Sequence, residues 1–230
     1  MGSVKRRIED NERGIGKYGH KKFVTDYPEE KLISMFKSEK PVMKIVVVGG
    51  GSGAPGKTAL LLRYVNNIYN RYSLKTTMGC GFFIKEIDVI KDVGMKIQFW
   101  DINQAGHSEG MSKNYYMGLS SAIIVCDLDD FNISFDQAKK WYEDITKNAQ
   151  PVNNFIFIIG TKCDLLSKDE LEKQKICLQE FAEEIGAIKY FITSAKEDIG
   201  VQEAFTAIAE INNNVLLFKC CCSFDGWREI

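Results

Sequence analysis

Residues 51–58 read Gly51-Ser52-Gly53-Ala54-Pro55-Gly56-Lys57-Thr58, and they follow the apolar run Ile-Val-Val-Val at 45–48. The stretch fits the pattern G-x-x-x-x-G-K-[ST], in which a buried strand opens into a glycine-rich loop and then a helix. Backbone N–H groups of such a loop turn inward onto phosphate oxygens, and the helix directs its positive end at the same anion. The sequence therefore predicts a site for nucleotide phosphates.

Two side chains of this stretch carry chemistry. Lys57 is expected to reach the β and γ phosphates, and we count it as a candidate catalytic residue. Thr58 is expected to place its hydroxyl on Mg²⁺, which prefers hard oxygen ligands. Pro55 has no N–H to offer and Ala54 replaces a glycine. Losing one hydrogen bond to a charged group costs roughly 1.5–3 kcal/mol, so we expect weakened but retained binding.

The composition indicates one globular domain. The chain has 230 residues, 45% of them hydrophobic, with 30 basic and 31 acidic side chains. This balance gives no support to nucleic-acid binding, for which a basic excess is typical. No apolar run is long enough to span a membrane, and the N-terminus lacks a secretory apolar region. The seven cysteines show no metal-ligand spacing, and the four that precede residue 200 are interpreted as reduced core thiols.

Strand and helix patterns alternate from residue 43 onward, which predicts an α/β fold with a mostly parallel six-stranded sheet and helices on both faces. A turn at 91–94 would make one edge of the sheet antiparallel. The expected strands cover 43–49, 81–90, 95–101, 121–127, 154–160 and 188–192. The expected helices cover 57–67, 134–149, 168–185 and 201–217. The nucleotide is expected at the carboxyl ends of the strands.

The base is predicted from two further motifs. The strand at 154–160 leads into Thr161-Lys162-Cys163-Asp164, and thirty residues later the chain reads Thr193-Ser194-Ala195-Lys196. The Asp164 carboxylate can accept hydrogen bonds from the ring N–H and the amino group of guanine, which adenine cannot offer in that geometry. Backbone N–H groups of the second motif would meet the guanine O6. The two motifs together favour GTP and GDP over ATP.

On these motifs, residues 43–217 resemble the small GTPases of the Ras superfamily, and they are most similar to the Rab branch. The Rab-like features are Trp100 before Asp101, the run 114–118, and Ser134-Phe135 followed by Trp141-Tyr142. Thr161 in place of Asn also occurs in the Rho branch, but the extra helix of that branch does not fit between the two base motifs. The resemblance implies the P-loop small-GTPase fold with Mg²⁺ as cofactor.

The resemblance also implies roles for single positions. Tyr69 matches the aromatic residue that packs against guanine, and Asp101 matches the acid that holds Mg²⁺ through a water. Thr77 matches the switch threonine that binds Mg²⁺ and the γ phosphate, although the spacing argues for Thr76. The predicted metal ligands are thus Thr58, Thr77 and Asp101. The predicted nucleotide-binding residues are Ser52, Gly53, Ala54, Gly56, Lys57, Thr58, Ala59, Tyr69, Thr77, Thr161, Lys162, Asp164, Ser194, Ala195 and Lys196.

The second switch departs from the family pattern. After Asp101 the family has x-x-Gly-Gln, in which the glutamine aligns the attacking water. Here Gln104 occupies the glycine position and Ala105 the catalytic one. Alanine cannot orient water, so we expect slow hydrolysis. The alternative is that Gln104 or His107 replaces the missing glutamine by approaching from a shifted loop.

The ends of the chain lie outside the predicted GTPase domain at 41–218. Residues 1–40 are expected to form a flexible extension with a short helix near 28–37, which would dock on its own domain or on a partner. The tail at 219–230 carries Cys220-Cys221-Cys222, but eight residues follow them, so this is not a C-a-a-X ending. The sequence leaves open whether these cysteines are lipidated or are plain reduced thiols. The expected location is the cytoplasm, or the cytosolic face of an endomembrane if the cysteines are lipidated.

The sequence thus predicts a guanine-nucleotide switch with slow GTP hydrolysis, by resemblance in vesicle trafficking or signalling. Effectors, exchange factors and activating proteins are the expected partners. The alternative is a GTP- or GDP-binding interaction module without turnover, a pseudo-GTPase, whose partner docks around residues 76–90. An ATP-using enzyme is disfavoured by Asp164.

Overall fold

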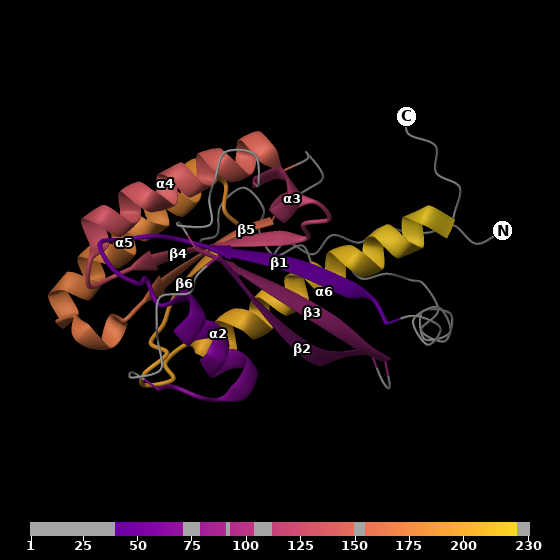
Figure 1. Ribbon diagram of the computed structural model, residues 1–230, viewed down its shortest axis with the longest axis horizontal. Coiled ribbons are helices and arrows are strands. Elements are labelled where there is room, and N and C mark those ends of the chain that lie inside the picture. The colour runs from indigo at the N-terminus through magenta and orange to yellow at the C-terminus, as the bar shows by residue number, and fades with distance from the viewer. Residues whose placement is uncertain (1–39, 71–78, 91–92, 104–111, 150–154, 225–230) are drawn as a thin grey trace, which may run out of the picture.

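The structure is a computed structural model of the chain, and it describes residues 40–70, 79–90, 93–103, 112–149 and 155–224 (Figure 1). Several sequence predictions fall outside these ranges: the short helix near 28–37, the switch threonine at Thr77 or Thr76, and the Gln104-Ala105 pair. They remain predictions. So does the division into an extension, a domain and a tail.

A single six-stranded sheet forms the centre of the described structure. Its order is β2-β3-β1-β4-β5-β6, and all neighbours are parallel except β2 and β3, which form an antiparallel hairpin. The strands are β1 (Val42–Val48), β2 (Cys80–Ile90), β3 (Val93–Ile102), β4 (Ser121–Asp127), β5 (Phe155–Thr161) and β6 (Lys189–Ile192). The predicted parallel sheet with one antiparallel edge is confirmed.

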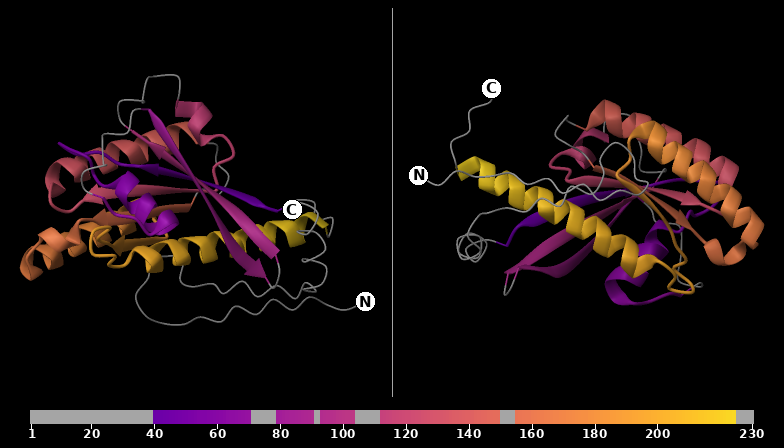
Figure 2. Two further views of the ribbon diagram at one scale, coloured as in Figure 1. Left: turned by 60° about the horizontal axis from the view of Figure 1, so that its bottom comes forward. Right: turned by 180° about the vertical axis from the view of Figure 1, so that it is seen from behind.

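Helices cover both faces of the sheet, as Figure 2 shows from two sides. They are α2 (Lys57–Asn66), α3 (Ser112–Tyr116), α4 (Phe131–Asn148), α5 (Lys168–Ile185) and α6 (Val201–Phe224). Helices α2 and α6 pack on one face, whereas α3, α4 and α5 pack on the other. Among the described helices, none combines the length and apolar character that crossing a membrane requires.

Strand β1 shows why the central strands read as continuous apolar runs. Its side chains alternate between the two faces, so Ile45 and Val47 join the core under α2 and α6, while Val46 and Val48 join the core under α4 and α5. All four are fully buried. A stretch of strand that is covered on both sides is apolar at successive positions, which is the pattern expected of a parallel sheet.

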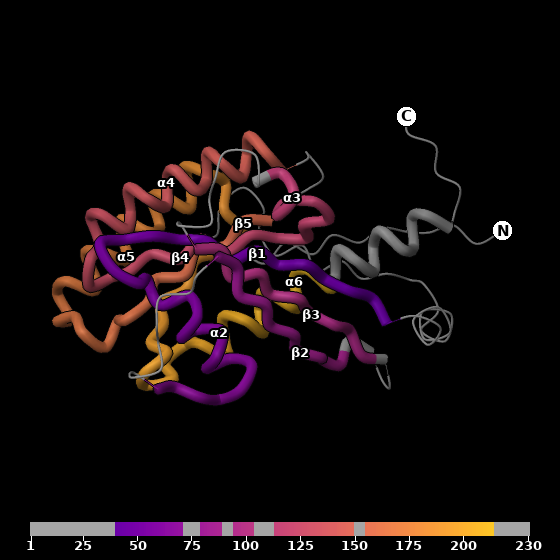
Figure 3. The backbone as a smooth tube through the Cα atoms, in the orientation of Figure 1, coloured from indigo at the N-terminus to yellow at the C-terminus, as the bar shows by residue number. Residues whose placement is uncertain are grey.

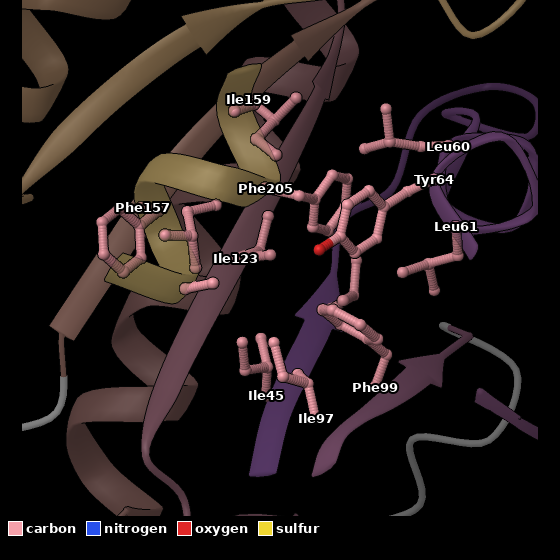
Figure 4. Packing of buried hydrophobic residues seen from close by; sticks show 14 of the residues in the cluster. Ile45, Leu60, Leu61, Tyr64, Ile97, Phe99, Ile123, Phe157, Ile159 and Phe205 are labelled. Atoms are coloured by element: carbon pink, nitrogen blue, oxygen red, sulfur yellow. The ribbon is translucent and has the colours of Figure 1, made fainter. Parts of the chain in front are cut away.

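The core under α2 centres on Tyr64. Its ring stacks on Phe205 of α6 at 4.3 Å between centroids and meets Phe99 of β3 edge-on at 5.8 Å (Figure 4). Phe99 and Phe205 also meet edge-on, at 5.4 Å. This aromatic cluster fixes α2, and therefore the loop before it, against both the sheet and α6.

Two helices have different ends from those predicted. The helix expected from residue 134 begins at Phe131, because Ser134 is not its N-cap: the first helical bond runs from the Ser134 N–H to the Asp130 carbonyl. The helix expected to end at 217 continues to Phe224, since neither Gly nor Pro interrupts it before Gly226. Cys220-Cys221-Cys222 therefore belong to α6. The short helix α3 and a 3₁₀ turn at Cys163–Leu165 were not predicted.

The cysteines that precede residue 200 are free, as predicted. Cys126 and Cys163 are buried, whereas Cys80 and Cys177 are only partly covered. Burial raises the pKa of the Cys126 thiol to about 12, so this side chain is a neutral core group at physiological pH.

Candidate nucleotide-binding site

A pocket of about 630 Å³ opens at the carboxyl ends of β1 and β5. The glycine-rich loop between β1 and α2 forms one end of it, and the residues after β5 and β6 form the other. We call these the phosphate end and the base end. The predicted site residues that line the pocket are Ser52, Gly53, Ala54, Gly56, Lys57, Thr58, Ala59, Tyr69, Thr161, Lys162, Asp164, Ala195 and Lys196.

Lys57 begins α2 at the phosphate end. Only 6% of the residue is exposed, and its ammonium donates to the Gly49 carbonyl at 3.0 Å. Burial lowers the pKa of Lys57, and the nearby charge of Asp101 partly offsets this effect. Gly56 precedes the helix with φ +88°, in the left-handed region that favours glycine. The loop therefore presents a buried cation and the amino end of a helix together.

Asp101, near the end of β3, lies beside Thr58 and is fully buried. The Thr58 hydroxyl donates to Asp101 Oδ2, while Asp101 Oδ1 is buried and has no hydrogen-bond partner among the described residues. Burial raises the pKa of Asp101, whereas the Thr58 hydrogen bond and the Lys57 charge lower it. An orphaned carboxylate oxygen beside a hydroxyl is a donor set that suits Mg²⁺.

The glycine-rich loop is longer than the motif alone implies, and α4 holds the additional part. Gly49 and Gly50 precede Gly51, and the Gly50 carbonyl accepts from the buried Ser134 hydroxyl at 2.7 Å. That hydroxyl also accepts from the Asp127 N–H at 2.8 Å.

A second contact from the start of α4 reaches Ser52. Asp130 Oδ2 accepts from the Ser52 hydroxyl at 2.6 Å and from the Ser52 N–H at 2.7 Å. The two bonds, that from the hydroxyl first, lower the pKa of the Asp130 carboxyl. The Ser52 N–H thus faces a protein carboxylate in this structure.

Thr161, the last residue of β5, connects the glycine-rich loop to the sheet. Its hydroxyl lies 2.7 Å from the Pro55 carbonyl and 3.2 Å from the Cys126 carbonyl, and the residue is 2% exposed. Pro55 is itself buried. Pro55 supplies no N–H to the loop, but its carbonyl oxygen accepts the hydrogen bond that connects the loop to Thr161.

The base end is built around Asp164. Asp164 Oδ1 accepts from the Ser194 hydroxyl at 2.6 Å, and the Lys196 ammonium lies 3.7 Å from Oδ2. The Glu197 N–H donates to the Ser194 hydroxyl oxygen at 3.1 Å. Ser194 is fully buried and is not among the described residues that line the pocket, so its hydroxyl supports Asp164 from behind.

Lys162 lies beside the same end of the pocket with a strained backbone. Its φ is +61°, and its ammonium pairs with the buried Asp127 carboxylate at 2.5 Å. The ammonium is therefore committed to Asp127, while the residue lines the pocket. Predicted site residues Thr77 and Gln104 lie outside the described ranges.

Sequence reasoning missed several residues that hold the site. Gly49, Asp127 and Asp130 were not selected, and Ser134 was noted only as a family feature. The two glycines before Gly51 were a signal for a longer loop, and the acidic run at 127–130 directly after an apolar strand was a signal for contacts at its carboxyl end.

Comparison with known proteins agrees with this geometry. The Ras family model matches residues 44–213. The Ypt/Rab-type GTPase YPT7 of Saccharomyces cerevisiae is 33% identical over 178 residues, which cover 76% of this chain and 83% of the relative. The human Ras-related protein Rab-17 is 32% identical over 173 residues, covering 75% of this chain and 77% of the relative. The chain therefore belongs to the Ras family of small GTPases, in its Rab branch.

Proposed function

We propose that this protein is a guanine-nucleotide switch that binds GTP and GDP with Mg²⁺. The observation that carries the proposal is the Asp164 carboxylate, held by Ser194 at the base end of a pocket whose other end is the glycine-rich loop. A fixed acceptor suits the N–H and amino donors of guanine and is unfavourable for adenine.

The remaining roles follow from position in the pocket. Lys57 would reach the β and γ phosphates, and Tyr69, which is half-buried, would pack on the base. Backbone N–H groups of the loop and of Ala195-Lys196 would meet the phosphates and O6. Ser194 acts through Asp164, and Thr161 positions the loop through Pro55.

Thr58 and Asp101, with Thr77 from the first switch, are the residues that would hold Mg²⁺. The buried Asp101 Oδ1 supports this assignment because it lacks a hydrogen-bond partner in the described part of the chain. When bound, the ion neutralises charge on the phosphate oxygens. Thr58 and Asp101 keep oxygen donors in place for it, and Lys57 adds a second positive charge.

Hydrolysis is slow in this proposal, because Ala105 stands where the family places the glutamine that orients water. The alanine at this position also favours the alternative function, a module that binds GTP or GDP and recruits a partner without turnover. By resemblance to the Rab branch, the switch acts in vesicle trafficking, and effectors, exchange factors and activating proteins are its partners. Membrane attachment requires lipidation of the C-terminal cysteines.

Competition binding tests the proposal on the full chain with Mg²⁺ and a fluorescent GDP. Unlabelled GDP should displace the probe at a concentration at least about 100-fold lower than ADP does, because only guanine satisfies Asp164. Asp164→Ala should remove most of this preference, whereas Glu180→Ala, on the exposed side of α5, should leave it unchanged. Equal competition by ADP, or absence of binding, would refute the assignment.

Phosphate release separates the two candidate functions. A single-turnover measurement with GTP should show hydrolysis well below that of ordinary relatives. A rate of zero, with GTP retained intact, would favour the binding module over the switch.

A further inference from the structure

We propose that Arg63 positions the guanine loop, residues 194–197, and thereby controls how selectively and for how long guanine is held. The inference rests on the proposed function. Arg63 lies on α2, far along the chain from the loop, and is half-buried between the two. Figure 3 shows the stretch between β6 and α6 passing beside α2.

The guanidinium of Arg63 donates to two carbonyl oxygens of the loop. Nε lies 2.8 Å from the Ala195 oxygen, and Nη2 lies 3.3 Å from the Lys196 oxygen. Arginine suits this task because its donors are arranged in a rigid planar fork, which holds successive acceptors in a fixed relation. Lysine has the same charge but lacks this geometry.

The contact with Lys196 leads to Asp164 through a short chain of hydrogen bonds. In a trans peptide the carbonyl and the following N–H point in opposite directions, so fixing the Lys196 oxygen also orients the Glu197 N–H. That N–H donates to the Ser194 hydroxyl oxygen at 3.1 Å, and the hydroxyl donates to Asp164 Oδ1 at 2.6 Å. Arg63 is thus connected to the carboxylate that would select guanine.

Arg63 also contacts the segment that carries Tyr69, another residue that lines the pocket. Its Nη1 donates to the Asn67 carbonyl at 3.3 Å and to Asn67 Oδ1 at 3.1 Å. Asn67 ends α2 with φ +55°, and Tyr69 follows two positions later. One side chain therefore links the segment that carries Tyr69 with the guanine loop, between which the base would lie.

A simpler role for Arg63 is to stabilise the carboxyl end of α2, where a positive charge is favourable. The two roles differ in their requirements. Stabilising the helix end needs only a charge, which lysine supplies. Positioning the guanine loop needs the fork, so lysine should not replace arginine.

The test uses the full chain loaded with a fluorescent GDP and, separately, with the matching IDP, which lacks the 2-amino group that Asp164 would recognise. Release of each probe is measured with Mg²⁺ for the wild type, Arg63→Ala and Arg63→Lys. Lys175→Ala is the matched control, because Lys175 is a helix cation whose described ion pair is with Glu172 on the same helix.

We expect both Arg63 variants to release GDP about 10- to 100-fold faster than the wild type, as the loss of several hydrogen bonds predicts. The preference for GDP over IDP should fall several-fold in both, because Asp164 is less well oriented. Lys175→Ala should match the wild type. Arg63→Lys keeps the helix charge, so thermal unfolding is expected to show it folded even if Arg63→Ala is not.

Two outcomes would overturn the inference: wild-type GDP release by Arg63→Lys, or GDP and IDP release rates that rise by the same factor. A wild-type protein that binds neither probe would instead refute the proposed function. The two failures are therefore distinguishable.

Discussion

At the base end of the pocket the hydrogen bonds connect the guanine motifs with one another, whereas at the phosphate end the loop is held mainly by residues outside its own motif. Asp164 and Ser194 bond each other between those motifs, the Glu197 N–H directly after the second motif bonds Ser194, and Arg63 lies behind them. The glycine-rich loop depends on Ser134 and Asp130 at the start of α4.

The difference separates two properties of the same pocket. The phosphate end supplies charge and backbone donors, which determine how strongly any nucleotide is held. In the proposed function, the base end supplies a fixed acceptor, which would determine which nucleotide is held. Changes at the phosphate end should therefore alter affinity without altering base preference.

The largest effect is expected from Lys57→Ala, which removes the buried cation at the phosphate end. Affinity for GDP should fall about 100-fold or more, since hydrogen bonds to charged groups and the charge itself are both lost. The remaining binding, measured by calorimetry, should keep its preference for GDP over IDP. Lys175→Ala is the control, and a changed preference in Lys57→Ala would contradict the separation of the two ends.

Ala105→Gln should have the next largest effect, on the rate and not on binding. Glutamine at this position would restore the group that orients the attacking water, so single-turnover hydrolysis should rise about 10- to 100-fold. Ala105→Asn, whose amide is one methylene shorter, serves as the matched variant and should give a smaller gain. No increase with glutamine would indicate that the second switch is inactive for a further reason.

The comparison also shows what the sequence could predict. The alternation of strands and helices and the motifs at 51–58, 161–164 and 193–196 lie in local patterns, and the structure brings these motifs to one pocket. The contribution of Arg63 could not be predicted, because its partners in the guanine loop lie more than a hundred positions away. A helical arginine looks like an exposed cation until the tertiary structure places carbonyl oxygens beside it.

Ser134 is a second residue whose role in the site the sequence alone did not predict. The predicted helix starts at this residue. The helix begins earlier, however, and the Ser134 hydroxyl is used between the Gly50 carbonyl and the Asp127 N–H. The sequence could not predict this role, because the Gly50 carbonyl lies far away along the chain.

Ser134→Ala should therefore weaken the phosphate end. It leaves a buried carbonyl and a buried N–H without their partner, which costs about 1–3 kcal/mol. We expect GDP affinity to fall about tenfold with base preference unchanged, as measured by competition with IDP. Ser121→Ala is a matched control, because Ser121 is equally buried and its hydroxyl has no hydrogen-bond partner among the described residues. Equal losses in both variants would show that the Gly50 contact is unimportant.

The smallest effect is expected from Asp130→Asn, because this contact with Ser52 is near solvent. An amide keeps one acceptor but loses the charge, so GDP affinity should change only about two- to threefold at neutral pH.

The pH dependence of stability is a more informative test of the Asp130 contact. The pKa of Asp130 is lowered in the folded protein, so as pH falls the unfolded chain takes up its proton first. The stabilisation is therefore present above the unfolded pKa, near 3.9, and is lost as pH falls through the folded value. The difference in unfolding free energy between wild type and Asp130→Asn, from urea titrations, should shrink as pH is lowered from 7 toward 3, because asparagine does not titrate. A difference that stays constant over this range would show that the Asp130 carboxylate does not hold the glycine-rich loop in solution.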